Sequence, residues 1–136
     1  MQEDALKIEA ERARKTNIIL FSIFLFIAAG IVIGVGIFKA QHTFSQEKWL
    51  RDVEHRYQMV DSLLEEYQLI GMSEAEVVGL LGDEEGGAQT SFKRSKAYYP
   101  PEDTLVYYLG VEYMDAMWLV LSLENGVAAD YCIDQS

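Results

Sequence analysis

The chain has 136 residues and a formal net charge of −11, which comes from 22 acidic and 11 basic side chains. A surface of that sign repels nucleic-acid phosphates and anionic lipid headgroups, so we expect no nucleic-acid partner. The single cysteine, Cys132, excludes an intrachain disulfide and a metal site built from several cysteines.

The first predicted element is a membrane span over residues 18–38. Ile18 to Phe38 is an apolar run without a charged side chain, and at about 1.5 Å per residue such a helix can cross the ~30 Å hydrocarbon core of a bilayer. A removable signal peptide and a buried helix of a soluble protein are the two alternatives. Signal peptides have a shorter apolar region and end in small residues, whereas bulky Phe38 ends this run. We therefore predict an uncleaved anchor.

Basic residues beside the span predict its orientation. Arg12, Arg14 and Lys15 precede it, whereas Lys39 alone follows it directly. Positive residues favour the cytoplasmic side, so residues 1–17 are a predicted cytoplasmic tail and the rest of the chain is predicted to be extracytoplasmic. The expected location is the cell membrane, with a single pass. The acids and bases of the tail cancel, so the net charge belongs to the domain after the span.

Within the span, Gly30 and Gly34 are separated by three residues, a spacing that lets two membrane helices approach closely. This predicts a helix–helix contact, and with it a homodimer. Glycine is also common in membrane helices that make no such contact, so both interpretations stay open. An exposed Cys132 would offer a second link between two chains, whereas in a strand it is a small apolar residue.

Residues 39–70 are predicted to form a juxtamembrane stalk, with one amphipathic helix from Gln41 to Leu69. Its apolar residues recur every three or four positions and so share one helical face: Leu50, Val53, Tyr57, Val60, Leu64 and Tyr67. Charged residues such as Arg56 fall elsewhere and are expected in solvent. We predict that the stalk packs on its own domain, with a short coiled-coil dimer as the alternative. His42 and His55 lack the spacing of a helical zinc pair.

A second, shorter helix is predicted after Gly71. Ser73 and Glu76 form a capping box, in which each side chain pairs with the backbone N–H of the other residue. Gly82 is expected to end this helix, because glycine adopts a left-handed conformation without steric cost. The following segment, Asp83 to Ser91, has no apolar period and lacks the ligand spacing of a calcium loop, so we expect a solvated acidic loop without metal.

Beyond that loop the apolar period changes to two, which predicts strands. Four are expected: Phe92 to Tyr99, Thr104 to Leu109, Ala116 to Leu123 and Val127 to Ile133. The Asn125-Gly126 pair is the preferred two-residue hairpin turn. The predicted inward residues of the last two strands are Met117, Leu119, Leu121 and Leu123, then Val127, Ala129, Tyr131 and Ile133. Residues 71–136 are thus predicted to form a two-layer α+β domain, with two helices on a three- to four-stranded antiparallel sheet.

Several short motifs resemble the BamE (SmpA/OmlA) family over roughly residues 60–134. They are Gly71-Met72-Ser73, Val77, Leu80-Leu81-Gly82, Val106-Tyr107-Tyr108-Leu109-Gly110, Leu119-Val120-Leu121 and Glu124-Asn125-Gly126-Val127. The resemblance implies two helices on a three-stranded sheet, in a small envelope protein that supports outer-membrane protein assembly by binding other proteins. The β-lactamase inhibitory proteins resemble the same layout. The chain departs from the family in its anchor, a span instead of a lipid, and in Asp83, where proline is common.

Catalytic signatures are missing from the sequence. Asp130 and Asp134, four positions apart on one strand, would lie ~13 Å apart and could not act on one bond. No serine stands in a G-x-S-x-G context, and no glycine-rich phosphate loop occurs. We predict no enzyme activity, no cofactor and no metal.

Aromatic residues are the candidate protein-binding site, because tyrosine and tryptophan combine apolar area with a hydrogen-bonding tip. The candidates are Tyr98, Tyr99, Tyr108, Tyr113 and Trp118. Nearby Lys93, Arg94 and Lys96 either protect an edge strand or contact an acidic partner. The predicted function is that of a membrane-anchored protein-binding module, an accessory factor of an envelope assembly. The alternatives are an inhibitor or regulator of an extracytoplasmic enzyme and a structural stalk dimer.

Overall fold

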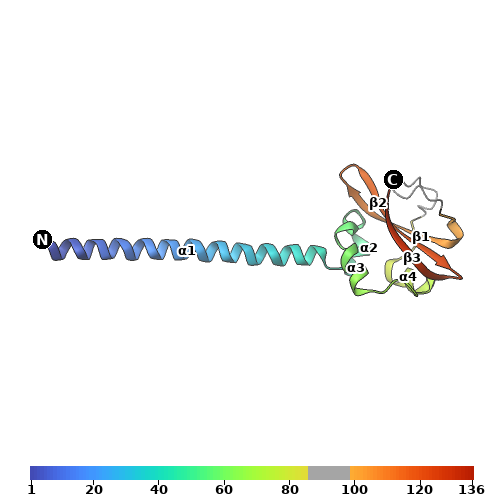
Figure 1. Ribbon diagram of the computed structural model, residues 1–136, viewed down its shortest axis with the longest axis horizontal. Helices are drawn as coiled ribbons and strands as arrows, with labels where there is room; N and C mark the ends of the chain where they lie inside the picture. The colour runs from blue at the N-terminus through green and yellow to red at the C-terminus, as the bar shows by residue number, and fades with distance from the viewer. Residues whose placement is uncertain (86–98) are drawn as a thin grey trace. The chain divides into compact units, whose positions relative to one another are not determined.

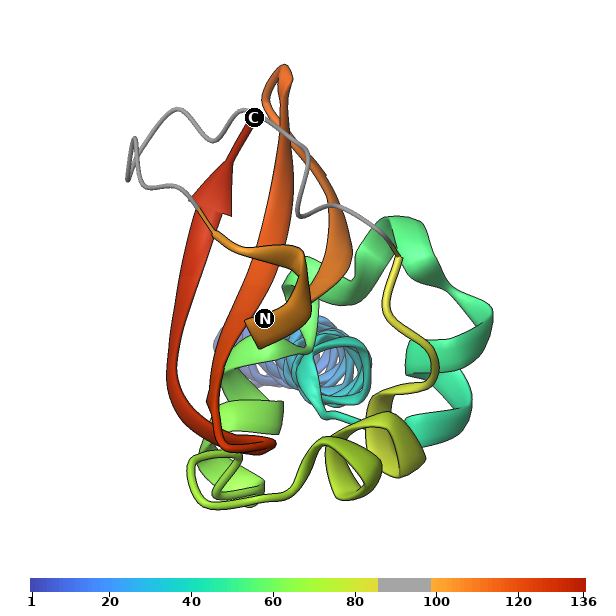
Figure 2. The same cartoon turned by 90° about the vertical axis from the view of Figure 1, so that its right-hand side faces the viewer.

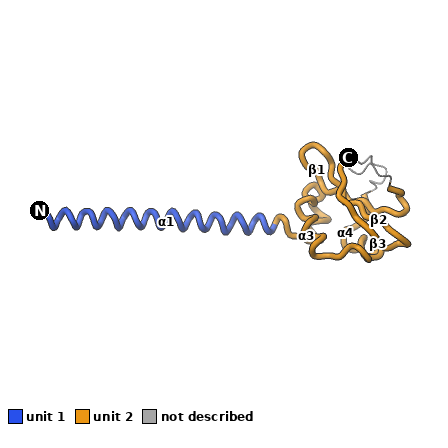
Figure 3. The backbone as a smooth tube through the Cα atoms, in the orientation of Figure 1, with its two compact units in different colours: residues 1–40 blue, residues 41–136 orange. Residues whose placement is uncertain are grey.

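The computed structural model describes residues 1–85 and 99–136. Its chain divides into two compact units, residues 1–40 and 41–136 (Figure 3). Most of the predicted strand from Phe92 to Tyr99 lies outside the described residues, as do Tyr98 and the basic cluster of Lys93, Arg94 and Lys96.

The first unit is formed by a single long helix, α1 (Gln2–His42), drawn blue to cyan in Figure 1. It contains the predicted span, and the predicted tail continues it toward the N-terminus. None of its residues is buried in protein, and it is the one described helix long and apolar enough to cross a membrane. All backbone groups of a span must pair within the helix once water is absent, and a continuous helix meets that requirement. The chain thus carries an N-terminal helix suited to a single-pass anchor.

The second unit is an α+β domain, as predicted. Its antiparallel sheet has the order β1-β2-β3, formed by β1 (Thr104–Glu112), β2 (Asp115–Glu124) and β3 (Val127–Gln135). Its helical segments are α2 (Gln46–Arg51), the 3-10 helix η1 (Val53–Gln58), α3 (Val60–Glu66), α4 (Glu74–Leu81) and the short 3-10 helix η3 (Pro101–Asp103). In Figure 2 the helices, coloured from teal (α2) through green (α3) to yellow-green (α4), lie to the right of and below the strands, which are orange to red.

The main core lies between these helices and one face of the sheet. Its fully buried side chains are Trp49, Leu63, Val77 and Leu81 from the helices and Tyr107, Leu109, Leu119 and Leu121 from the sheet. The predicted inward face of β2 is confirmed, because Met117 and Leu123 also belong to this core. Burying these side chains is the main driving force for the fold, at roughly 1.5–3 kcal/mol for each large apolar residue.

The single helix predicted from Gln41 to Leu69 is wrong. The segment is broken at residues 43–45, at Asp52 and again at Met59, so that the end of α1 is followed by α2, η1 and α3 as short pieces. An unbroken helix of that length would measure roughly 44 Å and could not bury one face against a sheet of nine- and ten-residue strands. Packing therefore overrides the apolar period: Leu50 of the predicted stripe is exposed, whereas Trp49 beside it is fully buried.

Local signals in the sequence are confirmed where they involve capping and turns. Ser73 N donates to Glu76 Oε2 at 2.8 Å and Glu76 N donates to Ser73 Oγ at 3.3 Å, which completes the capping box of α4. The carboxylate of Glu76 accepts from both the backbone N–H and the hydroxyl of Ser73, each at 2.8 Å, and these two hydrogen bonds to its charged form lower its pKa. Gly82 ends α4 with a φ of +86°, and the Asn125-Gly126 turn has φ values of +53° and +75°.

The predicted inward face of β3 is wrong at its first residues. The register shifts opposite Ser122 and Leu123, and Ala129 is left without a partner in the ladder. Ala128 is consequently buried in the core and Val127 is exposed. This register shift is set by the segment before α4, because Ala128 N donates to Met72 O and Gly71 N donates to Ala128 O, both at 2.8 Å. Beyond the bulge Ile133 packs on the core as predicted, whereas Tyr131, also predicted to face inward, is 38% exposed.

A close approach between β1 and η1 generates the first prediction. β1 bulges between Tyr108 and Gly110, where Gly110 has a φ of +112° and a Cβ would overlap the carbonyl oxygen of Glu54. We expect Gly110→Ala to lower the free energy of unfolding by more than ~2 kcal/mol, because the backbone must shift and the conformation is strained. Urea denaturation of the full chain in detergent micelles measures the loss.

Gly79→Ala is the matched control, because a Cβ on Gly79 of α4 meets no atom within 4 Å. This change should leave stability unchanged or raise it by up to about 1 kcal/mol. Equal losses for the two variants would contradict the close approach of β1 to η1.

Candidate functional site

Arg56 of η1 joins the helices to the sheet beside the hairpin of β1 and β2. Its side chain is only 4% exposed. Nε donates to the backbone oxygen of Trp49 at 2.7 Å, and Nη1 donates to that of Tyr108 at 3.1 Å. The guanidinium also lies 4.9 Å from the centre of the Trp49 ring, a cation–π distance. The sequence analysis missed this role, because the period of the predicted helix placed Arg56 in solvent.

Glu85 supplies the opposite charge. Both of its carboxylate oxygens accept from Arg56 Nη1 at 2.9 Å, and Oε2 also accepts from the backbone N–H of Tyr108 at 2.7 Å. The backbone N–H of Glu85 donates to Val106 O at 2.9 Å. The predicted solvated acidic loop is therefore wrong at Glu85, which is bound to β1; residues 86–91 of that loop lie outside the described residues.

Three of the five predicted binding residues lie on the outer face of the sheet, opposite the main core. Tyr108 and Trp118 are paired across β1 and β2, with their rings edge to face at 5.2 Å. The Tyr108 hydroxyl donates to Glu54 Oε2 at 3.0 Å, and Trp118 Nε1 donates to Ser136 Oγ at 2.9 Å. Both side chains are half-buried. Their polar tips thus serve the domain's own structure.

Tyr99 is engaged in a similar way. Its hydroxyl and the Sγ of Cys132 lie 3.1 Å apart in a hydrogen bond. Burial raises the pKa of the half-buried Cys132 thiol, a shift that disfavours the nucleophilic thiolate. Tyr99, Trp118 and Cys132 pack around the fully buried pair Val106 and Val120. This outer cluster is a second, smaller core.

Tyr113 is different. It stands with Met114 in the two-residue turn between β1 and β2, where the two side chains are 95% and 94% exposed. Val111, one residue before the end of β1, is 48% exposed. We call these three residues the hairpin tip. The structure therefore separates the candidates: Tyr99, Tyr108 and Trp118 have partners within the domain, Tyr113 projects into solvent, and Tyr98 lies outside the described residues.

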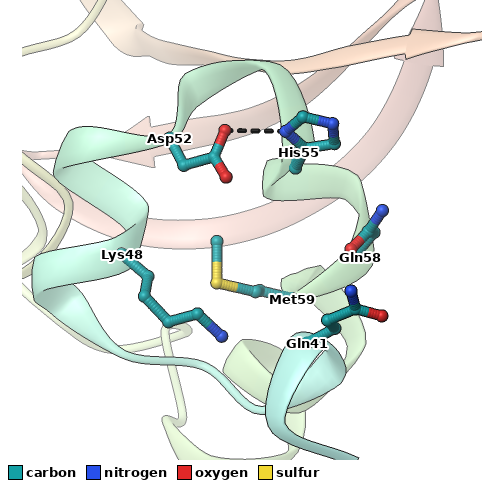
Figure 4. Close-up of a pocket in the computed structure, with 6 residues that line it drawn as sticks. All are labelled: Gln41, Lys48, Asp52, His55, Gln58 and Met59. Atoms are coloured by element: carbon teal, nitrogen blue, oxygen red, sulfur yellow. Dashed lines mark hydrogen bonds and ion pairs between the residues drawn. The ribbon is translucent and has the colours of Figure 1, made fainter. Parts of the chain in front are cut away.

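A cleft of about 220 Å³ lies beside α2 and η1 (Figure 4). It is lined by Gln41, Lys48, Asp52, His55, Gln58 and Met59. His55 Nδ1 lies 2.7 Å from Asp52 Oδ1, so the ring nitrogen donates to the carboxylate and the orientation of the ring is fixed. These six lining residues, all within the described chain, include no hydroxyl or thiol that this pair could activate. The cleft can hold a small polar group.

In α1, a Cβ on Gly30 or Gly34 would meet no atom within 4 Å, so both glycines leave a small surface on the helix. A contact between two such helices stays a prediction. Comparisons of the chain with family models, with curated proteins and with solved structures found no match. The resemblance to the BamE family likewise stays a prediction.

The buried hydroxyl of Tyr107 leads us to predict that the domain loses stability at alkaline pH. Tyr107 is buried between the sheet and α4, donates to Gly82 O at 3.0 Å, and has a pKa raised far above 10, first by burial and then by the nearby carboxylates. The folded state therefore keeps this proton at a pH where the unfolded chain loses it. Stability from this group is complete below pH 10 and is lost as the pH rises further, by up to about 1.4 kcal/mol per pH unit.

Urea unfolding of the full chain between pH 9 and pH 11 measures this loss. Tyr107→Phe should lower stability by about 1 kcal/mol at pH 8, because the hydrogen bond is lost, and should make the decline above pH 10 shallower. The other tyrosines are the same in both chains and so cancel in the comparison. If both chains lose stability equally above pH 10, burial does not raise the pKa of the Tyr107 hydroxyl.

Proposed function

We propose that this chain is a membrane-anchored protein-binding module, with α1 in the membrane and the acidic α+β domain on its extracytoplasmic side. The hairpin tip makes the contact with the partner. In this function the chain acts as an accessory factor that holds its partner close to the membrane, as the resemblance to small envelope proteins implies.

The observation that carries the proposal is the exposure of Tyr113 and Met114. Large apolar side chains at interfaces supply most of the binding free energy, and tyrosine is among the residues most enriched there. A tip of this kind has no function in the domain's own core. Among the described residues of the domain, the next most exposed large apolar residue is Leu50 at 50%, so Tyr113 and Met114 stand out as the residues placed for docking.

The two alternatives are affected differently by the structure. A coiled-coil stalk dimer depended on a continuous helix from Gln41 to Leu69, and that segment instead uses Trp49, Val60 and Leu63 in its own core. An inhibitor of an extracytoplasmic enzyme stays open, because a projecting hairpin with apolar residues at its end can enter an enzyme's substrate cleft. The identity of the partner distinguishes an inhibitor from an accessory factor.

Site-specific photocrosslinking in living cells tests the proposed function. A photoreactive phenylalanine analogue is placed in the full-length chain at one of four exposed positions of the domain: Leu50, Gln68, Tyr113 or Val127. A further chain carries it at Val35 in α1 as a membrane control. We expect a protein adduct of defined mass from at least one domain position and lipid labelling from position 35.

Mass spectrometry of the adduct identifies the partner. A non-enzymatic envelope protein supports the accessory role, and a hydrolase supports the inhibitor. Absence of any protein adduct from all four domain positions, with normal membrane insertion, would contradict a protein-binding function.

A further inference from the structure

The cleft beside α2 and η1 carries opposite charges at its two ends. Figure 4 shows Asp52 and His55 at one end, Lys48 and Gln41 at the other, and the Met59 side chain between them. Lys48 already interacts within the chain, but an ammonium has three donors and keeps its positive charge. The cleft therefore matches a small ligand that itself carries both charges.

The part of the cleft that holds Asp52 is built from hydrogen-bond acceptors. His55 donates from Nδ1 to Asp52 Oδ1 at 2.7 Å, so in the neutral ring Nε2 keeps a lone pair. Gln58 donates from Nε2 to the Tyr57 hydroxyl at 3.2 Å, which leaves its Oε1 as an acceptor. A carboxylate, a ring nitrogen and an amide oxygen thus line one cleft. Together they suit a ligand with several N–H donors, such as a primary ammonium.

Chain length keeps this cleft close to the membrane surface at any orientation of the domain. Gln41 is the third residue after Phe38, the last residue of the predicted span, and α1 continues through both. At about 1.5 Å per helical residue, Gln41 lies roughly 4.5 Å beyond the span, whereas the headgroup layer is about 5–7 Å thick on each side of the hydrocarbon core. Phe44 is already buried in the domain's core, so the connection is short. Lipid headgroups are therefore within reach of the cleft.

We infer that this cleft binds the headgroup of a phosphatidylethanolamine, a zwitterionic lipid with a primary ammonium. The ammonium donates to Asp52, Gln58 and His55. The phosphate lies toward Lys48 and Gln41. The net charge of −11 disfavours an anionic lipid, whereas a zwitterionic headgroup has no net charge. A choline headgroup has no N–H donor and leaves the acceptors unsatisfied. This lipid contact is separate from the protein contact of the hairpin tip.

Native mass spectrometry of the full-length chain tests the inference. The chain is placed in nanodiscs that contain equal amounts of phosphatidylethanolamine, phosphatidylcholine and phosphatidylglycerol, and the lipids that stay bound after release in mild detergent are counted. We expect phosphatidylethanolamine to be retained about tenfold more than either other lipid, because its ammonium alone makes charged hydrogen bonds in the cleft. Equal retention of the three lipids would overturn the inference.

Asp52→Asn should abolish this preference, because the negative charge is lost while the amide oxygen still accepts from His55. Asp61→Asn is the matched control: Asp61 is exposed on α3, lies outside the lining of the cleft, and its substitution changes the net charge equally. The control should keep the preference, and both variants should unfold at the urea concentration of the parent chain. A preference that survives Asp52→Asn, or that Asp61→Asn abolishes, would contradict binding in this cleft.

Side-chain amide signals in NMR spectra locate the bound headgroup in the unaltered chain. As the share of phosphatidylethanolamine in phosphatidylcholine nanodiscs rises, the signals of Gln41 and Gln58 should shift, and that of Gln68, exposed elsewhere in the domain, should not. Soluble glycerophosphoethanolamine at the same concentration should shift neither, because the anchor raises the effective concentration of the lipid alone. Equal shifts with the soluble headgroup, or an unchanged Gln58 signal with the lipid, would show that the inference is wrong.

Discussion

The domain depends on one buried cation. Arg56 contacts the end of α2 through Trp49 O, the strand β1 through Tyr108 O, and the segment after α4 through Glu85. A buried guanidinium is costly unless its donors are used, and removing one partner of such a pair typically costs several kcal/mol. The position of the base of the β1–β2 hairpin relative to the helices therefore depends on Arg56.

The sequence predicted those elements whose signals are local. The capping box of Ser73 and Glu76, the turn at Asn125-Gly126 and the inward face of β2 depend on residues close in the chain, and all are confirmed. The helix from Gln41 to Leu69 failed because three- and four-residue spacing says nothing about where a helix must bend to fit a small sheet. The bulge in β3 was not predicted for a related reason, because backbone hydrogen bonds with Gly71 and Met72 set it.

The candidate site was predicted in composition but not in geometry. Residue type alone could not tell Tyr108, whose hydroxyl donates to Glu54, from Tyr113, which projects into solvent. The sequence did not place Tyr113 in a two-residue turn, because the predicted strands ended at Leu109 and began again at Ala116, whereas the structure extends them to Glu112 and Asp115. In the proposed function, α1 is the membrane anchor, Arg56 holds the base of the β1–β2 hairpin, and the hairpin tip contacts the partner.

A double-mutant cycle on Arg56 and Glu85 tests the central claim most directly. Arg56→Met, Glu85→Gln and the combined variant are compared with the parent chain by urea unfolding in micelles at neutral pH. If this pair holds the helices, the hairpin base and the segment after α4 together, the coupling free energy should be about 1–3 kcal/mol. Losses that add to within ~0.3 kcal/mol would contradict the claim, because the two side chains would then act independently.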